Sequence, residues 1–150
     1  MQYRISAGAL VLRDNRLLLL RHFSPRYDFW APPGGGVEGH ETLEAAAERE
    51  TLEETGLTVK ARRLAYIDEV WSATSRTIKL WFVADCAAGV INLDSNPAPG
   101  ESIVEAVWLG RGDPLPGRLV FPLPLHGRFW VDLATGFATP IRLPLQRQQV

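Results

Sequence analysis

The pattern of hydrophobic and polar residues predicts strands on both sides of one strong helix. Strand-like segments alternate in polarity or form short apolar runs between turn residues, and they occupy residues 3–12, 16–21, 57–71, 77–85 and 104–109. Asp14 and Asn15 form a typical turn, so the first two segments are expected to make a hairpin. Residues 111–124 contain four prolines and are expected to be irregular, while residues 125–134 are predicted as a second helix.

The strongest helix prediction covers residues 42–55, which are rich in Glu, Ala and Leu. Thr42 is a suitable N-cap, and Gly56 is a natural stop at the C-terminal end. The order of strands, helix, strands and helix favours an α+β fold, a mixed α/β sandwich with helices packed on a sheet. We expect one domain spanning residues 1–150.

Composition adds no strong charge bias to this picture. The formal net charge is −1, so the whole molecule gives no reason to expect a nucleic acid or an anionic membrane as partner. The one cysteine, Cys86, cannot form an intramolecular disulfide, which fits a reducing compartment. No apolar run approaches the roughly 20 residues that span a bilayer. We expect a cytoplasmic protein that is a monomer or a homodimer.

Three glutamates gather on one side of the predicted helix. At about 100° per residue, Glu50, Glu53 and Glu54 continue the small apolar stripe of the preceding turns. Like charges four residues apart destabilise a helix by about 0.2–0.5 kcal/mol per pair, and anions near its C-terminus oppose the helix dipole. A cation among them would reverse both penalties, and carboxylate oxygens suit Mg²⁺ or Mn²⁺ better than Zn²⁺. The alternative is a solvated acidic face.

A spaced set of residues around the helix favours the cation site over the solvated face. The set comprises Gly35, Glu41, Arg49, Glu50, Glu53, Glu54, Gly56 and the apolar Leu57. Its spacing resembles the Nudix box, the signature of the Nudix hydrolase family, over 23 of the 150 residues. One position departs from the pattern, because Thr51 stands where a larger aliphatic residue is usual. We interpret that departure as a change in packing.

The resemblance implies hydrolysis of a nucleoside diphosphate linked to another moiety, usually with Mg²⁺ (Mn²⁺ as the alternative), on an α/β/α sandwich built around a mixed sheet. It implies that Glu50, Glu53 and Glu54 are metal ligands, and that Arg49 orients a carboxylate. Metals that bridge phosphate oxygens neutralise charge and hold an in-line water, whose proton a carboxylate can accept. That base is one of the three glutamates or a carboxylate from a later loop.

Further carboxylates are candidates for completing the site. Glu101 is the first candidate for the later-loop carboxylate and is counted with Glu53, Glu50 and Arg49 as catalytic. Glu105 is the second candidate, and Asp68 and Glu69 are weaker ones. Two residues of the box are assigned mainly structural roles: Gly56 ends the helix, and Glu41 precedes it, where a carboxylate is favoured electrostatically. Glu41 is expected to be structural, to contact metal, or both.

Substrate contacts are expected from glycines beside the metals and from basic and aromatic residues. Residues 34–36 are all glycine and would let the chain turn tightly at this point. The expected substrate-binding residues are Gly35, Gly36, Arg21, Arg26 and Trp71, with His22, Phe23, Trp30 and Tyr66 as further candidates. Several subfamilies carry a signature residue about 16 or 17 positions past the box. Ala73 and Thr74 stand there, so the identity of the nucleoside diphosphate derivative stays open.

Two functions of different class have support in the motif, and a third, a plain structural or interaction protein, has only the exposed-looking C-terminal segment in its favour. The first is the metal-dependent hydrolase, and the second is a catalytically silent Nudix-fold sensor that binds nucleotides. A sensor need not keep every metal carboxylate, whereas this chain keeps them all, which favours the hydrolase. If the three carboxylates repel one another, Glu53→Gln or Glu54→Gln should also stabilise the metal-free protein.

Overall fold

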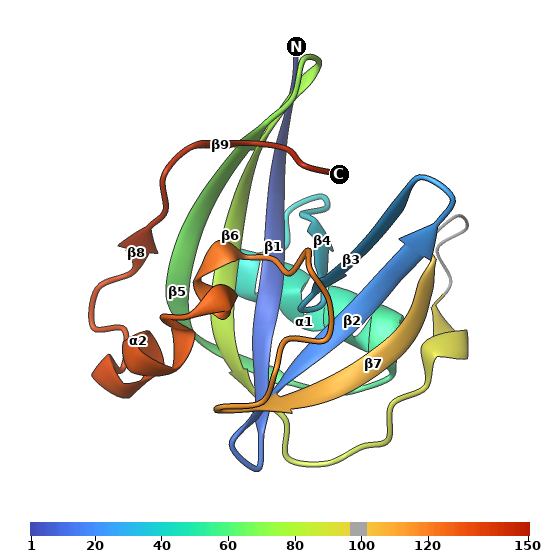
Figure 1. Cartoon of the computed structure of the whole chain (residues 1–150), viewed down its shortest axis with the longest axis vertical. Coiled ribbons are helices and arrows are strands. Elements are labelled where there is room, and N and C mark those ends of the chain that lie inside the picture. The colour runs from blue at the N-terminus through green and yellow to red at the C-terminus, as the bar shows by residue number, and fades with distance from the viewer. Residues whose placement is uncertain (97–101) are drawn as a thin grey trace.

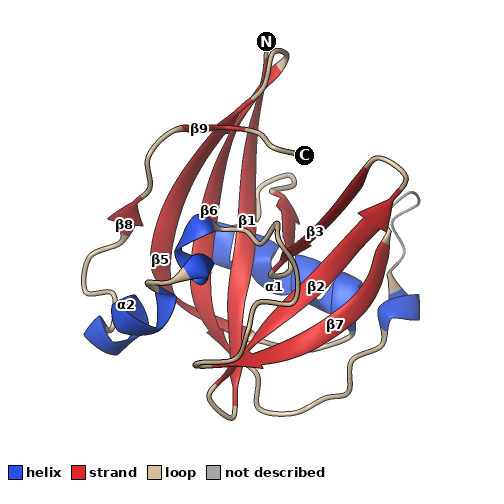
Figure 2. Ribbon diagram, in the orientation of Figure 1, coloured by secondary structure: helices blue, strands red, loops and turns tan. Residues whose placement is uncertain are grey.

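The computed structural model describes residues 1–96 and 102–150 as a curved mixed sheet with helices on both faces (Figures 1 and 2). The elements in chain order are β1 (Gln2–Arg13), β2 (Arg16–Ser24), β3 (Tyr27–Ala31), β4 (Gly34–Gly36), α1 (Leu43–Thr55), β5 (Lys60–Trp71), β6 (Ser75–Asp85), the 3₁₀ turn η1 (Leu93–Ser95), β7 (Ile103–Gly110), the 3₁₀ turn η2 (Leu123–His126), α2 (Phe129–Thr135), β8 (Ile141–Arg142) and β9 (Gln146–Arg147). The α+β fold and the helix expected over residues 42–55 are confirmed.

The sheet divides into two wings that meet at the lower end of β1. β1 pairs in parallel with β6 from Gln2 to Leu12, and antiparallel β5 extends that wing. β2 meets β1 only at the hairpin, where Leu12 lies opposite Leu17, and then continues into a second wing with β3 and β7. The two wings diverge upward in Figure 1, and the short strand β4 lies between them, paired with β1.

Alternation along β1 produces two hydrophobic cores. Ala7, Ala9 and Val11 point to the face covered by α1, whereas Leu10 points to the opposite face, where it packs with Phe129 of α2. Successive strand residues face opposite sides, so a single strand contributes to both cores. Both faces of the sheet are therefore covered, as expected for an α/β/α sandwich (Figure 2).

Two local predictions were wrong. The second helix is not continuous over residues 125–134, because the backbone leaves helical geometry at Gly127 and separates η2 from α2. The triple glycine does not form a tight turn, since Gly34–Gly36 is a strand antiparallel to β1. None of its three residues has a positive φ. Glycine is needed there for close approach, because a Cβ on Gly34 would lie 2.8 Å from the Cα of Gly8.

No helix among the described residues is long and apolar enough to cross a lipid bilayer. The longest, α1, has 13 residues and an acidic surface toward β4. The helices therefore cover the sheet, and α1 carries the motif that the sequence singled out.

Candidate functional site

α1 is fixed at both ends and along its buried side. The Thr42 hydroxyl accepts the Ala45 N–H at 3.1 Å, and Gly56 ends the helix with φ 78°. Thr51, which departs from the family pattern, is fully buried, and its hydroxyl donates to the Ala47 carbonyl at 2.7 Å. A buried hydroxyl without a partner would cost about 1–3 kcal/mol, so this backbone bond explains how the helix tolerates a polar residue in the core.

Arg49 is the centre of the polar network beside α1. Its guanidinium donates two bonds to Glu41, from Nε at 3.0 Å and from Nη2 at 2.8 Å. Nη1 donates to Glu50 at 3.1 Å and to Glu53 at 3.2 Å, and Nη2 also reaches the Gly36 carbonyl at 3.0 Å. The bonds to Glu41 raise the pKa of Arg49 further, and Arg49 lowers the pKa of the Glu41 carboxyl. One side chain thus ties the helix, the preceding loop and β4 together.

β4 packs against two of the three glutamates. The Gly34 N–H donates to Glu54 Oε1 at 2.8 Å. The Cα of Gly35 faces the Glu50 carboxylate so closely that a Cβ there would lie 2.5 Å from Oε1. Glu50 and Glu54 are buried, whereas the Glu53 side chain is 33% exposed. One carboxylate is therefore bonded to the backbone of β4, the second packs closely against it, and the third is partly open to solvent.

The donor set has the chemistry of a site for a hard divalent cation. Three carboxylates from adjoining turns of one helix supply oxygen ligands, and Gly35 leaves room for one of them. In the described part of the chain no three acidic, His or Cys side chains converge into a ready chelate. Arg49 explains this arrangement, because it lies among Glu41, Glu50 and Glu53. A cation bound here would compete with the Arg49 contacts for carboxylate oxygens.

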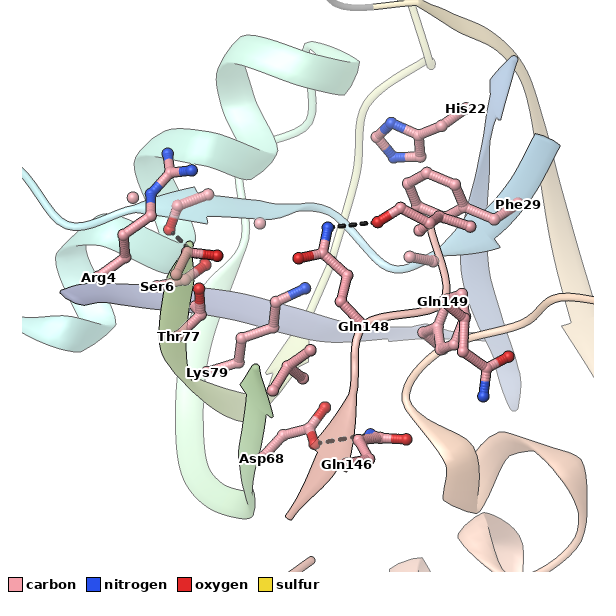
Figure 3. A pocket seen from close by; sticks show the side chains of 18 of the residues that line it. Arg4, Ser6, His22, Phe29, Asp68, Thr77, Lys79, Gln146, Gln148 and Gln149 are labelled. Carbon is pink, nitrogen blue, oxygen red and sulfur yellow. Dashed lines mark hydrogen bonds between the residues drawn. The ribbon is translucent and has the colours of Figure 1, made fainter. Parts of the chain in front are cut away.

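β4 separates this acidic face from a cavity of about 460 Å³ between the two wings of the sheet (Figure 3). The cavity has an aromatic wall on the β2–β3 wing, polar side chains on β1, β5 and β6, and a cover formed by the C-terminal segment. The aromatic wall includes His22, Tyr27 and Phe29. The side formed by β1, β5 and β6 includes Arg4, Ser6, Asp68, Thr77, Lys79 and Trp81, and the cover consists of residues 146–150. Gly34, Gly35 and Gly36 line its edge toward α1.

The aromatic wall contains a stacked pair of uncharged rings. The rings of His22 and Phe29 stack with centroids 4.6 Å apart and an interplanar angle of 2°, and Tyr27 tilts against Phe29 at 5.6 Å. Burial, with the positive charge of Lys79, lowers the pKa of His22 to about 4. The imidazole is therefore neutral at neutral pH. A stacked, uncharged surface of this kind suits the face of a nucleobase.

The floor of the cavity carries charged groups on neighbouring strands. Asp68 on β5 and Lys79 on β6 are partners in the antiparallel register. Gln146 of β9 donates to Asp68 Oδ1 at 3.1 Å. Burial raises the pKa of Asp68, an effect that the Gln146 bond and the Lys79 charge oppose, and burial lowers the pKa of Lys79. The floor therefore offers both an acceptor and a donor.

The structure places three of the expected substrate-binding residues outside the lining of this cavity. Arg21 donates to both oxygens of Asp28 at 2.9 Å and faces a second cavity near Glu105. Arg26 is exposed in the turn between β2 and β3. Trp71 is 39% exposed and stacks with Arg147 at 5.7 Å.

Other candidates are also set apart from the cavity or fall outside the described part of the chain. Tyr66 is fully buried in the core, and Trp30 is 5% exposed there. Glu105 forms a 3.5 Å ion pair with Arg21. Glu101 lies outside the described residues. Sequence reasoning missed Arg4 and Lys79, although the alternation of residues 77, 79 and 81 on one strand face could have indicated the latter.

Comparisons with known proteins agree with this architecture. A model of the NUDIX domain matches residues 2–122. NAD-capped RNA hydrolase NudC of Chromobacterium violaceum is 38% identical over 126 residues, which are 81% of this chain and 43% of that protein. The chain spans about two-fifths of the length of the curated relatives it matches.

Solved structures share the fold over most of the chain. A NUDIX hydrolase from Nitrosomonas europaea has a TM-score of 0.71 at 21% identity and covers 99% of this chain and 80% of its own. A MutT NUDIX hydrolase from Burkholderia pseudomallei has a TM-score of 0.64 at 27% identity, with 81% of this chain and 92% of its own covered. The mixed sheet between helices is therefore an arrangement shared with these proteins.

Proposed function

The chain belongs to the NUDIX domain family, and from this premise we propose that it hydrolyses a diphosphate linkage in a nucleoside diphosphate derivative with the help of a divalent cation. One observation carries the proposal. The acidic face of α1, ordered by Arg49, lies directly across β4 from a cavity that has the size and the aromatic wall for a nucleoside. A substrate in the cavity would place its phosphates along the glycines of β4.

We assign Glu50, Glu53 and Glu54 to the cation, with Mg²⁺ first and Mn²⁺ as the alternative. A bound divalent cation would neutralise phosphate charge and make a bound water more acidic. Glu53 is our candidate for the proton acceptor, because it is the most solvent-exposed of the three glutamates. Glu101 stays a candidate for the carboxylate from a later loop, by its sequence position alone.

Positioning and substrate contacts are assigned to other residues. Arg49 holds the carboxylates of α1 in place, Glu41 anchors Arg49, and Gly56 ends the helix. The bare Cα of Gly35 and the N–H of Gly36 would let phosphates approach closely. The stacked pair of His22 and Phe29 is our candidate for base binding, in place of Trp71, which does not line the cavity. Arg4, on the polar wall of the cavity, replaces Arg21 and Arg26 as the cationic candidate.

The proposed partner is a small nucleoside diphosphate derivative, and a capped RNA end is the second candidate. The relatives named NAD-capped RNA hydrolase support the second candidate. The net charge of −1 favours the small molecule, since RNA binding depends largely on cationic contacts with phosphates.

The test is product release from nucleoside triphosphates, ADP-ribose, nucleotide-sugars, NAD and NAD-capped RNA, with Mg²⁺ and with chelator. We expect turnover of at least one small substrate in Mg²⁺ and none with chelator. Glu53→Gln should abolish most of it, whereas Glu44→Gln, an exposed position in the first turn of the same helix, should not. Binding of these nucleotides without turnover in either metal would favour the silent sensor and overturn the proposal.

A further inference from the structure

The floor of the cavity carries two side chains with opposite hydrogen-bonding capacity. Asp68 and Lys79 are register partners on β5 and β6, and such partners point to the same face of a sheet. Figure 3 shows both side chains directed into the cavity below Gln148. An ionised carboxylate only accepts hydrogen bonds, and an ammonium only donates them. The pair therefore presents an acceptor beside a donor.

The two groups do not saturate each other. Among the described residues, Glu69 pairs with Arg76 at 2.8 Å and with Arg142 at 3.0 Å, but no ion pair within 4.0 Å joins Asp68 to Lys79. The Trp81 indole N–H is close enough to Asp68 to lower the pKa of that carboxyl, but with the described residues it forms no hydrogen bond of full geometry, although Trp81 is only 5% exposed. Buried polar groups usually have partners. The polar groups on the cavity floor can therefore form further hydrogen bonds, which indicates that this part of the cavity binds a ligand with polar atoms.

The C-terminal segment holds the acceptor in place. Gln146 of β9 pairs with Val70 of β5, and its side chain donates to Asp68 Oδ1. The Gln148 N–H donates to the Trp71 carbonyl at 2.7 Å, which fixes the segment where it crosses the cavity. These residues lie beyond residues 2–122, which the family model matches. The floor is therefore completed by a part of this chain that lies outside the matched domain.

We propose that Asp68 and Lys79 read the edge of a nucleobase and select bases with a ring carbonyl next to a ring N–H, namely guanine, uracil or thymine. Lys79 would donate to the carbonyl oxygen, and Asp68 would accept the N–H, while the His22–Phe29 pair stacks on the ring. Held in the same orientation, with the ribose toward β4, adenine and cytosine would place an amino group at Lys79 and a bare ring nitrogen at Asp68, so donor would meet donor and acceptor would meet acceptor. This inference rests on the proposed function, because it assumes that the cavity holds the nucleoside.

The experiment measures equilibrium binding without catalysis. GDP, ADP, UDP and CDP are titrated into the full chain in excess chelator, and heat release gives each dissociation constant. An unpaired buried polar group typically shifts binding by a factor of about 5 to 150, so we expect GDP to bind at least tenfold more tightly than ADP, and UDP at least tenfold more tightly than CDP. Equal affinities, or tighter binding of ADP, would overturn the inference.

Variants identify the residues responsible. Asp68→Asn supplies an amide that can both donate and accept, so the preference for GDP over ADP should fall below about threefold, and Lys79→Met should have the same effect by removing the donor. Glu69→Gln is the matched control, because Glu69 is the next carboxylate on β5, does not line the cavity and is ion-paired with Arg76 and Arg142. It should retain the preference of the wild type. A preference that survives in both Asp68→Asn and Lys79→Met would contradict the assignment.

The binding and hydrolysis experiments can fail separately. Base preference without metal-dependent turnover would overturn the proposed hydrolysis and leave the reading of the base intact. Metal-dependent turnover without base preference would overturn the reading of the base and leave the proposed hydrolysis intact. If Asp68→Asn does not fold, Gln146→Ala removes only the bond that orients Asp68 and should reduce the preference by at least threefold.

Discussion

Replacing Gly35 by alanine should damage the site while leaving the fold nearly unchanged. The added Cβ would lie 2.5 Å from both Cδ and Oε1 of Glu50, whereas ordinary contacts begin near 3.4 Å, so the carboxylate must retreat by about 1 Å. The end of a glutamate side chain can move without unfolding α1, so the melting temperature should change little. A misplacement of about 1 Å can cost on the order of 100-fold in rate, which corresponds to about 2.7 kcal/mol of transition-state stabilisation.

The assay is kcat/KM for the best substrate of the panel at saturating Mg²⁺, together with thermal unfolding. Gly36→Ala is the neighbouring comparison, because its Cβ would meet no atom of the described residues within 4 Å. We expect its loss of kcat/KM to be at least tenfold smaller than that of Gly35→Ala. If Gly35→Ala retains kcat/KM within twofold of the wild type, the position of Glu50 against β4 does not matter for catalysis and the reasoning fails.

Three further predictions test other parts of the structure. Arg49→Lys replaces a planar group that makes several directed bonds with a point charge, so kcat/KM should fall at least tenfold at saturating Mg²⁺; an unchanged value would remove Arg49 from the site. His22 has its pKa lowered to about 4 in the folded state, so the unfolded chain takes up the proton first, and stability should fall by up to about 3 kcal/mol as pH drops from about 6.5 to 4. Urea unfolding at several pH values should show that the His22→Phe variant loses less stability than the wild type over that interval. Identical stability profiles of the two proteins would contradict the lowered pKa of His22. Tyr66→Phe removes a 2.6 Å bond to buried Asp132, so urea unfolding should show a loss of about 1–2 kcal/mol with kcat/KM within twofold; unchanged stability would show that the bond contributes nothing.

The sequence predicted the position of the acidic face but not its energetics. Helical periodicity alone places Glu50, Glu53 and Glu54 together, and the structure confirms that they lie on the side of α1 toward β4. The expected repulsion among them is offset, because Arg49 donates to two of the glutamates and the Gly34 N–H donates to Glu54. The structure therefore gives no reason to expect that Glu54→Gln stabilises the metal-free protein.

The cavity could not be predicted from local pattern. Alternation along β2 places Arg21 and His22 on opposite faces of the strand, but it does not indicate which face borders a cavity. His22, not Arg21, lines the cavity, because the cavity arises where the two wings of the sheet diverge. The C-terminal cover depends on β8 and β9, which have two residues each and pair with β5 more than 70 residues earlier in the chain. Two-residue strands carry no periodicity that a sequence pattern can reveal.

We expect the acidic face of α1 to bind a divalent cation, and calorimetric titration of Mn²⁺ into substrate-free protein measures this binding without catalysis. Binding to the wild type should be saturable, binding to Glu53→Gln should be at least tenfold weaker, and Glu44→Gln should keep the affinity of the wild type. Mn²⁺ affinity that is equal in the wild type and in Glu53→Gln, or an absence of saturable binding in the wild type, would contradict this expectation.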